Sequence, residues 1–208
     1  YQLTTTTTNQ LGTIWTQNTI DLTCPFTLSY NIFFGSGGAD GLCFIIQNNS
    51  NTYLGPTTSG GGGLGYLGLN NSFAIEFDTY QNSGTTNNNG SSQGQDATSN
   101  HMCFFKNGSL LHNSANQLAP PVNIPSWTME NGAAHAVVIT WNPVTQNVSC
   151  VFDNNALYTV SATVDLPSII GSNNVYYGFS ASTGGETNLQ KVCPLANPPT
   201  ILPPQNEL

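Results

Sequence analysis

A group of oxygen- and nitrogen-bearing side chains gathers in the middle of the sequence. The run Glu-Phe-Asp-Thr-Tyr-Gln-Asn supplies Glu76, Asp78 and Asn82, and a Gly/Asn/Ser-rich segment then leads to Asp96 and His101. Two carboxylates that lie close together repel one another unless a positive charge lies between them. The chain has only two Lys and Arg residues. A divalent cation is therefore the expected partner of these carboxylates.

The types of donor atom indicate two kinds of ion. Carboxylate and amide oxygens of Asp78, Asn82 and Asp96, together with a backbone carbonyl, suit Ca²⁺. Glu76 and His101 beside them suit a softer transition ion such as Mn²⁺. The alternative is a solvated polar turn, because acidic and amide residues at this spacing are common in loops. Spacing alone leaves both interpretations open.

A strand must position the first of these residues. Apolar and polar residues alternate from Phe73 to Thr79, which is the period of a half-buried strand. Residues two apart on a strand point to the same face. We therefore expect Glu76, Asp78 and Tyr80 on one face, with Asn82 just past the end of the strand.

The rest of the chain predicts an all-β domain. Asn, Thr, Ser and Gly are abundant and Lys and Glu are scarce, which disfavours helices and favours strands joined by turns. Many short strands separated by turns are typical of a β-sandwich. We expect one domain over residues 1–193 and a stiff proline-rich tail or linker over 194–208. The further predicted strands are 14–22, 26–34, 39–47, 102–105, 135–141, 148–152, 157–160, 175–181 and 189–193.

Composition argues against several classes of function. Charged residues make up 6% of the chain and the formal net charge is −8, which argues against nucleic acid and anionic membrane surfaces as partners. No apolar run approaches the ~20 residues that span a bilayer, so no membrane insertion is expected. The glycine run before Leu64 is followed by no Lys and no helix signal, which argues against a nucleotide-binding loop. The chain starts at Tyr1 without a leader pattern, as in a mature or trimmed product.

We expect the cysteines and the remaining histidines to have structural roles. Five cysteines lack paired C-x-x-C spacing, and an odd number leaves at least one free or paired with another chain. Two internal disulfides remain open, and so does a role as small buried hydrophobes for Cys43, Cys103 and Cys150. We expect His112 at the surface, just after a strand. His135 opens an apolar strand and is expected to be a hydrogen-bonded structural residue.

Four blocks in order resemble the legume-type (L-type) lectin family over about residues 12–193. They are Ala39–Leu42, Gly65–Leu69, Glu76–Asn82 and Val175–Gly184. Asp96 and His101 keep the Asp-x4-His spacing of the family's metal motif. The resemblance implies a concanavalin-like jelly-roll sandwich of two antiparallel sheets, with a cis peptide before the aspartate of the first block.

The resemblance also implies roles for individual residues. The implied calcium ligands are Asp78, the Tyr80 carbonyl, Asn82 and Asp96. The implied ligands of the manganese-type ion are Glu76, Asp78, Asp96 and His101. The implied sugar-binding groups are the Asp40 carboxylate, the Gly65 N–H, the Asn82 amide, the Tyr80 ring and the loop around Gly185 and Glu186. A carboxylate, an amide, a backbone N–H and an aromatic ring together match the hydroxyls and the C–H face of a sugar.

The chain departs from the family pattern, and two other functions stay open. Asn82 and Asp96 lie further apart than in the family, so the inserted residues either enlarge the binding surface or displace Asp96. The family's serine that holds a metal-bound water has no clear match. A glycoside hydrolase on a similar sandwich would need a third acidic residue where Gln81 and Asn82 stand. A scaffold or adhesive module could keep the fold without the ligand.

These patterns together predict a calcium-dependent carbohydrate-binding domain without catalysis. The expected partners are glycans or glycoconjugates. The expected location is secreted or on a cell surface, in glycan recognition or adhesion.

Overall fold

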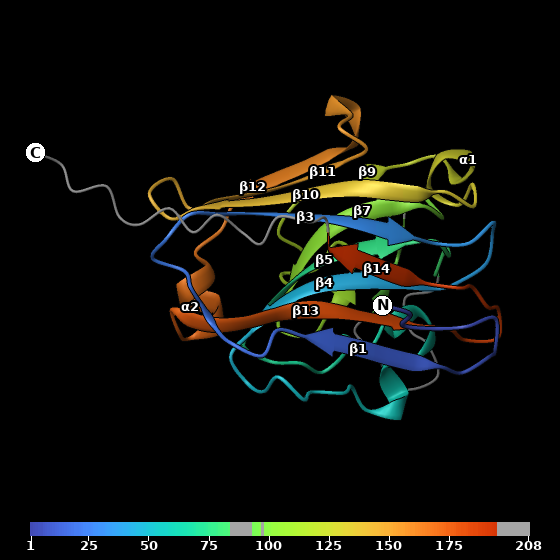
Figure 1. The fold of residues 1–208 in the computed structure, drawn as a ribbon, viewed down its shortest axis with the longest axis horizontal. Coiled ribbons are helices and arrows are strands. Elements are labelled where there is room, and N and C mark those ends of the chain that lie inside the picture. Colours follow the sequence, from blue (N-terminus) through green and yellow to red (C-terminus); the bar gives the residue numbers. More distant parts are fainter. Residues whose placement is uncertain (84–92, 97, 195–208) are drawn as a thin grey trace, which may run out of the picture.

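Two antiparallel sheets pack face to face in the computed structural model (Figure 1). The structure describes residues 1–83, 93–96 and 98–194. The predicted β-sandwich is confirmed, and the strands that carry the candidate site lie in the larger sheet. Except for Pro194, the predicted proline-rich tail lies outside the described residues.

The larger sheet has seven strands and forms one layer of the sandwich. Its order is β1 (Leu11–Trp15), β13 (Asn174–Ser182), β4 (Gly41–Gln47), β5 (Ser72–Asp78), β7 (His101–Lys106) and β9 (Val122–Asn123), with β2 (Ile20–Asp21) beside β13. Strands distant in sequence are therefore neighbours, as β13 and β4 show. This arrangement brings the blocks around residues 40, 76 and 180 together.

The second layer is a five-stranded sheet. Its order is β12 (Thr159–Thr163), β11 (Asn147–Phe152), β10 (Ala134–Asn142), β3 (Phe26–Phe33) and β14 (Lys191–Pro194). A separate parallel pair joins β6 (Gln93–Gly94) to β8 (Leu110–Leu111). The short helices are α1 (Ser126–Met129) and α2 (Leu166–Ile170), and the 3₁₀ turns are η1 (Thr57–Ser59), η2 (Gly61–Gly63) and η3 (Ala156–Tyr158).

Two predicted strands differ from the structure. The strand expected over 14–22 is broken between β1 and β2, where exposed Gln17 and Asn18 form a bend. The strand expected over 157–160 begins only at Thr159. Asn155 accepts a hydrogen bond from the Leu157 N–H and so favours the turn η3 instead. Both differences arise because local Asn chemistry outweighs the apolar pattern.

The larger sheet is buried on both faces. Phe73, Ile75 and Phe77 of β5 lie in the core between the two sheets. On the opposite face, Ala74 joins a second apolar cluster that includes Leu64 and Tyr66 from the loop before β5. All seven residues of β5 are therefore buried, whereas the alternating pattern predicted a half-buried strand. The covering loop is the reason at Ala74, whereas Glu76 is buried against His101 and His112.

The five cysteines are all free thiols. Cys43, Cys103 and Cys150 are fully buried among apolar side chains. Of the two interpretations that the sequence left open, the structure therefore supports small buried hydrophobes.

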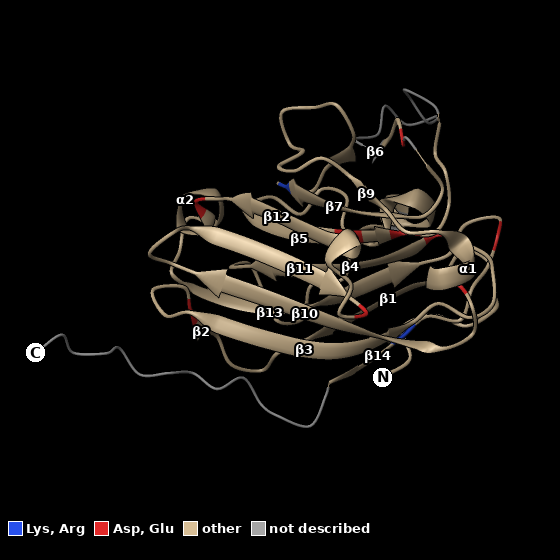
Figure 2. Ribbon diagram, turned by 90° about the horizontal axis from the view of Figure 1, so that it is seen from above, with Lys and Arg blue, Asp and Glu red and all other residues tan. Residues whose placement is uncertain are grey.

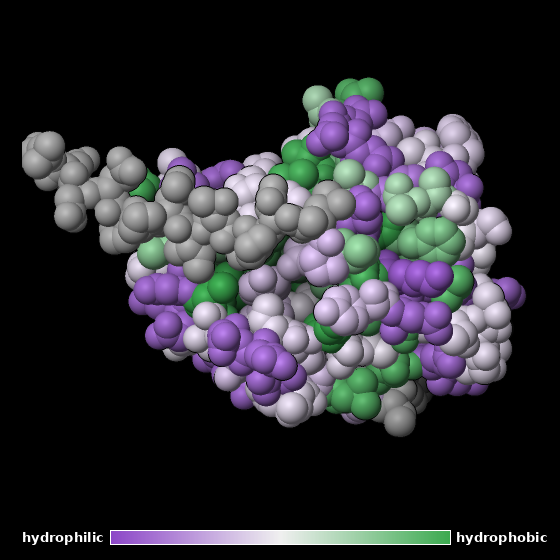
Figure 3. Space-filling view, viewed as in Figure 1, coloured by the Kyte–Doolittle hydropathy of each residue, from purple (hydrophilic) through white to green (hydrophobic). Residues whose placement is uncertain are grey.

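The chain carries few charged residues. Figure 2 shows very few basic segments, and several acidic ones lie close together beside β4 and β5. On the face shown in Figure 3, hydrophobic groups are scattered among hydrophilic ones. Within the described ranges, no helix is long and apolar enough to cross a membrane.

Candidate functional site

Strand register brings the predicted metal ligands together. In the β5–β7 pair, Asp78 lies opposite His101 and Glu76 lies opposite Cys103. In the β4–β5 pair, Gly41 lies opposite Asp78, so the chain around Asp40 runs beside the same end of β5. Because residues two apart share a face, Glu76, Asp78 and His101 all lie on the side of the sheet away from the main core.

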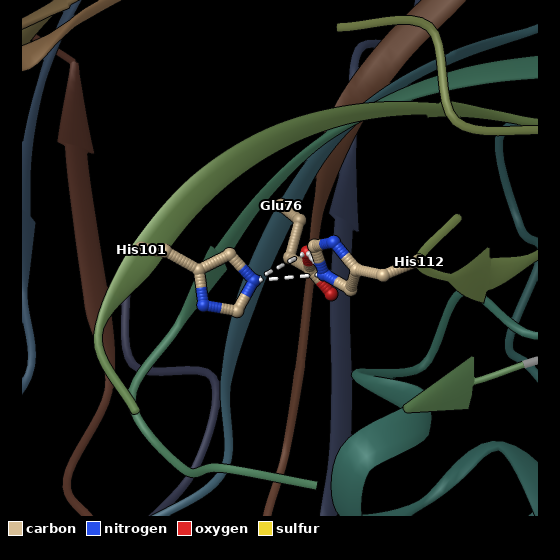
Figure 4. A group of neighbouring side chains, drawn as sticks. All are labelled: Glu76, His101 and His112. Atoms are coloured by element: carbon tan, nitrogen blue, oxygen red, sulfur yellow. Dashed lines mark hydrogen bonds and ion pairs between the residues drawn. The ribbon is translucent and has the colours of Figure 1, made fainter. Parts of the chain in front are cut away.

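Two imidazoles and two carboxylates converge on this face, and we call them the histidine cluster: Glu76, Asp96, His101 and His112. The His101 Nε2 atom lies 3.1 Å from Glu76 Oε2 and 3.0 Å from His112 Nε2. The His112 Nε2 atom also lies 3.4 Å from Glu76 Oε2 and 3.5 Å from Asp96 Oδ1. Figure 4 shows both rings pointing toward the Glu76 carboxylate. All four residues are buried.

His112 was predicted at the surface, and that prediction is wrong. Its exposed fraction is 2%. The cause is the pairing of β8 with β6, because the His112 N–H donates to the Gly94 carbonyl at 3.0 Å and the chain turns inward there. The edge of its ring also packs against Phe105. The sequence signal that could have indicated this buried position is the histidine directly after the apolar pair Leu110–Leu111.

Asp96 lies with the other predicted ligands despite the inserted residues before it. Its Oδ2 atom accepts a hydrogen bond from the Asn82 N–H, and its carbonyl accepts one from the Gln81 side chain at 3.2 Å. The Tyr80 N–H in turn donates to Asp78 Oδ1 at 2.6 Å. Asp96 is therefore not displaced, and the residues that flank the insertion hold it in place.

The electrostatics of the site call for positive charge. Burial raises the pKa of Asp78 well above its usual range, and the charges of Glu76 and Asp96 raise it further. Burial likewise raises the pKa of Asp96 to about 6. Burial also works to raise the pKa of Glu76, but hydrogen bonds from His101 and His112 outweigh it, so this pKa is lowered. Three buried carboxylates beside two imidazoles are the donor set that a divalent cation requires, so these residues fit the implied ions.

A second group, which we call the sugar-facing group after the predicted role of Asp40 and Asn82, lies beside the predicted metal ligands and consists of Asp40, Gly61, Gly62, Asn82 and Gly184. The Ala39–Asp40 peptide is cis, as expected. The Asp40 side chain is 5% exposed, and its Oδ2 atom has no hydrogen-bond partner. A Cβ atom on Gly184 would lie 3.1 Å from this oxygen. The absence of side chains at Gly61 and Gly184 therefore allows the backbone to pack directly around this carboxylate.

The charge state of Asp40 depends on this enclosure. Burial raises its pKa to about 7, while a backbone hydrogen bond from Gly184 lowers it and the charge of Glu186 raises it. Near neutral pH the carboxylate is therefore close to half protonated in the absence of nearby cations. A cation bound close by would favour the ionised form.

The structure brings a different glycine to this group than the sequence predicted. Gly65 is buried, its N–H donates to the Ser59 carbonyl at 2.8 Å, and a Cβ atom there would meet Leu11 at 2.7 Å. Gly62 lies against the Asn82 side chain instead, where a Cβ atom would come 2.2 Å from Asn82 Oδ1. The signal for this position was the run of four glycines before Leu64, which makes close backbone approach feasible.

The remaining residues with a predicted role in sugar binding are exposed to solvent. Tyr80 is 42% exposed although its neighbours on β5 are buried. Gly185 and Glu186 are exposed on the loop that follows Gly184. This loop is therefore next to the Asp40 carboxylate, as its predicted role in sugar preference requires.

Glu130 was not singled out in the sequence, and it connects loops around the site. Its Oε2 atom accepts a hydrogen bond from Asn100 at 2.6 Å, and Oε1 accepts one from Asn188 at 3.4 Å. Asn100 precedes His101, and Asn188 lies in the loop between β13 and β14, which also contains Gly184. Nothing in the local pattern around α1 indicated this role.

Comparison with known proteins agrees with the predicted fold and family. The model of the legume lectin β-barrel domain matches residues 1–195. Favin from Vicia faba is 29% identical over 187 residues, which cover 83% of this chain and 69% of favin. The lectin of Pisum sativum is 30% identical over 193 residues, covering 83% of this chain and 61% of that protein. Lectin I-B4 of Griffonia simplicifolia in its metal-free form superposes with a TM-score of 0.70 at 22% identity, covering 92% of this chain and 83% of the other.

The chain belongs to the L-type lectin family. It is therefore a carbohydrate-binding domain without catalysis, on the concanavalin-like jelly-roll sandwich. The glycoside hydrolase alternative no longer applies.

Proposed function

We propose that this domain binds glycans in a calcium-dependent manner through the sugar-facing group. The observation that carries the proposal is the Asp40 carboxylate, which is nearly buried and keeps Oδ2 without a partner between Gly61 and Gly184. A buried carboxylate oxygen without a partner costs free energy unless a ligand satisfies it. Sugar hydroxyls are donors that suit this oxygen.

Calcium would act by holding the polar residues next to this carboxylate. Asp78, Asn82, Asp96 and the Tyr80 carbonyl supply the oxygen ligands that calcium prefers. Because Asn82 also contacts Gly62, an ion bound there would fix the Asn82 amide at the sugar-facing group. Glu76, Asp78, Asp96 and His101 would hold a transition ion such as Mn²⁺ beside it.

The sugars bound by similar structures support glycans as the ligand class. The basic winged bean lectin was solved with Tn-antigen, and the winged bean acidic lectin with methyl-α-D-galactose. Their TM-scores against this chain are 0.69 and 0.66. We infer a secreted or cell-surface role in glycan recognition or adhesion, where glycoconjugates are the accessible partners.

A glycan array with the purified domain tests this proposal. The array is read in calcium, after chelation, and again after calcium is restored. We expect binding to a defined class of sugars that disappears with the chelator and returns with calcium. Binding that survives chelation would contradict calcium dependence, and silence in all three conditions would favour a scaffold module without a sugar ligand.

A further inference from the structure

The His112 imidazole lies where an extra metal ligand would lie. Its Nε2 atom faces His101 Nε2, Glu76 Oε2 and Asp96 Oδ1 at once, at 3.0, 3.4 and 3.5 Å. A single Nε2–H can satisfy only one of these three atoms. Hydrogen bonding alone therefore leaves this arrangement incomplete, whereas one ion could bind the ligand atoms of Glu76, His101 and His112 at once.

The spacing of the donor atoms matches ligands of a common ion. Two ligand nitrogens at about 2.1 Å from an ion lie about 3.0 Å apart when they meet at a right angle, and about 3.4 Å apart in a tetrahedral arrangement. The separation between the nitrogens of His101 and His112 is 3.0 Å, and their separations from Glu76 Oε2 are 3.1 and 3.4 Å. These three atoms can therefore be neighbours in one coordination sphere.

The backbone fixes His112 in this orientation. The hydrogen bond from its N–H to Gly94 ties it to β6, two residues before Asp96. The Phe105 ring packs against the imidazole with centroids 5.0 Å apart. A ligand that is held before the ion arrives loses little conformational freedom on binding.

We propose that His112 is a direct ligand of the transition ion, together with Glu76 and His101, because the ligand atoms of these three residues all lie within 4.8 Å of one another. The proposal deepens the proposed function, because it concerns the ion beside the calcium site. Two imidazoles favour borderline ions such as Zn²⁺ over Mn²⁺ more strongly than one imidazole does. The site is therefore expected to select Zn²⁺, with one coordination position left for water.

Zinc X-ray absorption on the calcium-loaded domain tests the ligand directly. Scattering from imidazole rings gives the number of histidines bound to zinc, and the wild-type chain should give two. A count of one, or a domain that binds no zinc, overturns the proposal. This measurement needs neither a variant nor a sugar, so its failure is distinct from a failure of glycan binding.

Variants then assign the second imidazole to His112. His112→Asn should lower the count to one and weaken zinc binding at least about tenfold in competition with a chelating indicator. Its preference for zinc over manganese should also fall. The matched control is His135→Asn, which removes another buried histidine, one that is hydrogen-bonded to Asp153 away from the cluster. If His112→Asn and His135→Asn weaken zinc binding equally, the loss is structural and the assignment is wrong.

Discussion

His101 and His112 point their Nε2 atoms at each other across 3.0 Å, although one begins β7 and the other follows β8. The relationship depends on a parallel pair of short strands outside both main sheets. The larger sheet therefore supplies Glu76, Asp78 and His101, and the β6–β8 pair positions His112. Each part of the site can be tested separately.

Replacing Asp40 should remove sugar binding and leave the fold intact. Asp40→Asn keeps the size of the side chain but removes the charged acceptor, and a hydrogen bond to a charged group contributes about 1.5–3 kcal/mol. We expect glycan affinity to fall more than tenfold, measured by titration calorimetry in calcium. Asp21→Asn is the matched control and should change affinity much less, because Asp21 is exposed on β2 opposite Asn174, away from the site. Equal affinity of Asp40→Asn and the wild type would refute the role of the carboxylate.

A methyl group at Gly62 should displace the Asn82 amide. The added Cβ atom would lie 2.2 Å from Asn82 Oδ1, so the side chain must move. We expect Gly62→Ala to weaken both calcium and glycan binding. Gly185→Ala is the matched control for calcium binding, because a Cβ atom there meets nothing within 4 Å and Gly185 is not a predicted calcium ligand. Similar calcium binding by the two variants would show that Gly62 and Asn82 do not form part of the site.

The metal-free protein should become less stable as the pH rises from about 4 to about 7. In this window Asp40, Asp78 and Asp96 keep protons in the folded state that they have lost in the unfolded state, because burial raises each pKa. His101 changes the stability in the same direction. Burial lowers its pKa, but Glu76 outweighs burial and raises it, so the stabilisation from His101 is lost as the pH rises through this raised pKa. Glu76 has the opposite effect, because its pKa is lowered in the folded state. It therefore stabilises the fold at pH values above its usual pKa, and this stabilisation is lost in acid.

Thermal unfolding with and without ions measures this dependence. The Tm of the chelated protein should be higher at pH 5 than at pH 7.5. Calcium and zinc should raise the Tm most at pH 7.5, because their ligands must be deprotonated. A chelated protein whose Tm rises with pH over this window would show that the buried carboxylates are not protonated in the folded state.

Removing the Glu130 carboxylate should loosen the loops around the site. Glu130→Ala leaves the amides of Asn100 and Asn188 without their partner, and each such loss costs about 1–3 kcal/mol. For a domain of this size, 1 kcal/mol corresponds to about 2–4 °C in Tm. We expect a Tm lower by several degrees and weaker sugar binding. Glu186→Ala, which removes an exposed carboxylate, should leave the Tm within about 1–2 °C of the wild type.

The sequence predicted the sandwich and most of the site because those features depend on the alternation of apolar and polar residues and on the order of the motifs along the chain. Alternation along β5 placed Glu76 and Asp78 on one face, and the order of four blocks indicated the family. Sequence could not show that this strand is buried on both faces, because the covering loop has no strand or helix period of its own. The pattern therefore gave the direction of the side chains correctly and their solvent exposure incorrectly.

The positions that sequence missed depend on long-range contacts. His112 is buried through β6, a strand of two residues that no pattern reveals. Gly62 rather than Gly65 lies against the Asn82 side chain, and only this packing distinguishes the two glycines. Glu130 acts through two amides from other loops. In each case the identity of the residue was visible, but its neighbours were not.

The two separate apolar clusters on the faces of the larger sheet give the domain two levels of cooperativity. The main core joins both sheets, whereas the second consists of fewer residues and lies under the loop that carries Gly62. Cooperative units with fewer buried contacts open at lower free energy. The amide hydrogens of Leu64 and Tyr66 should therefore exchange through partial unfolding of the domain, whereas those of Ile139 and Cys150 should exchange only through global unfolding. We therefore expect the proposed ions and sugar to exchange without unfolding of the main core.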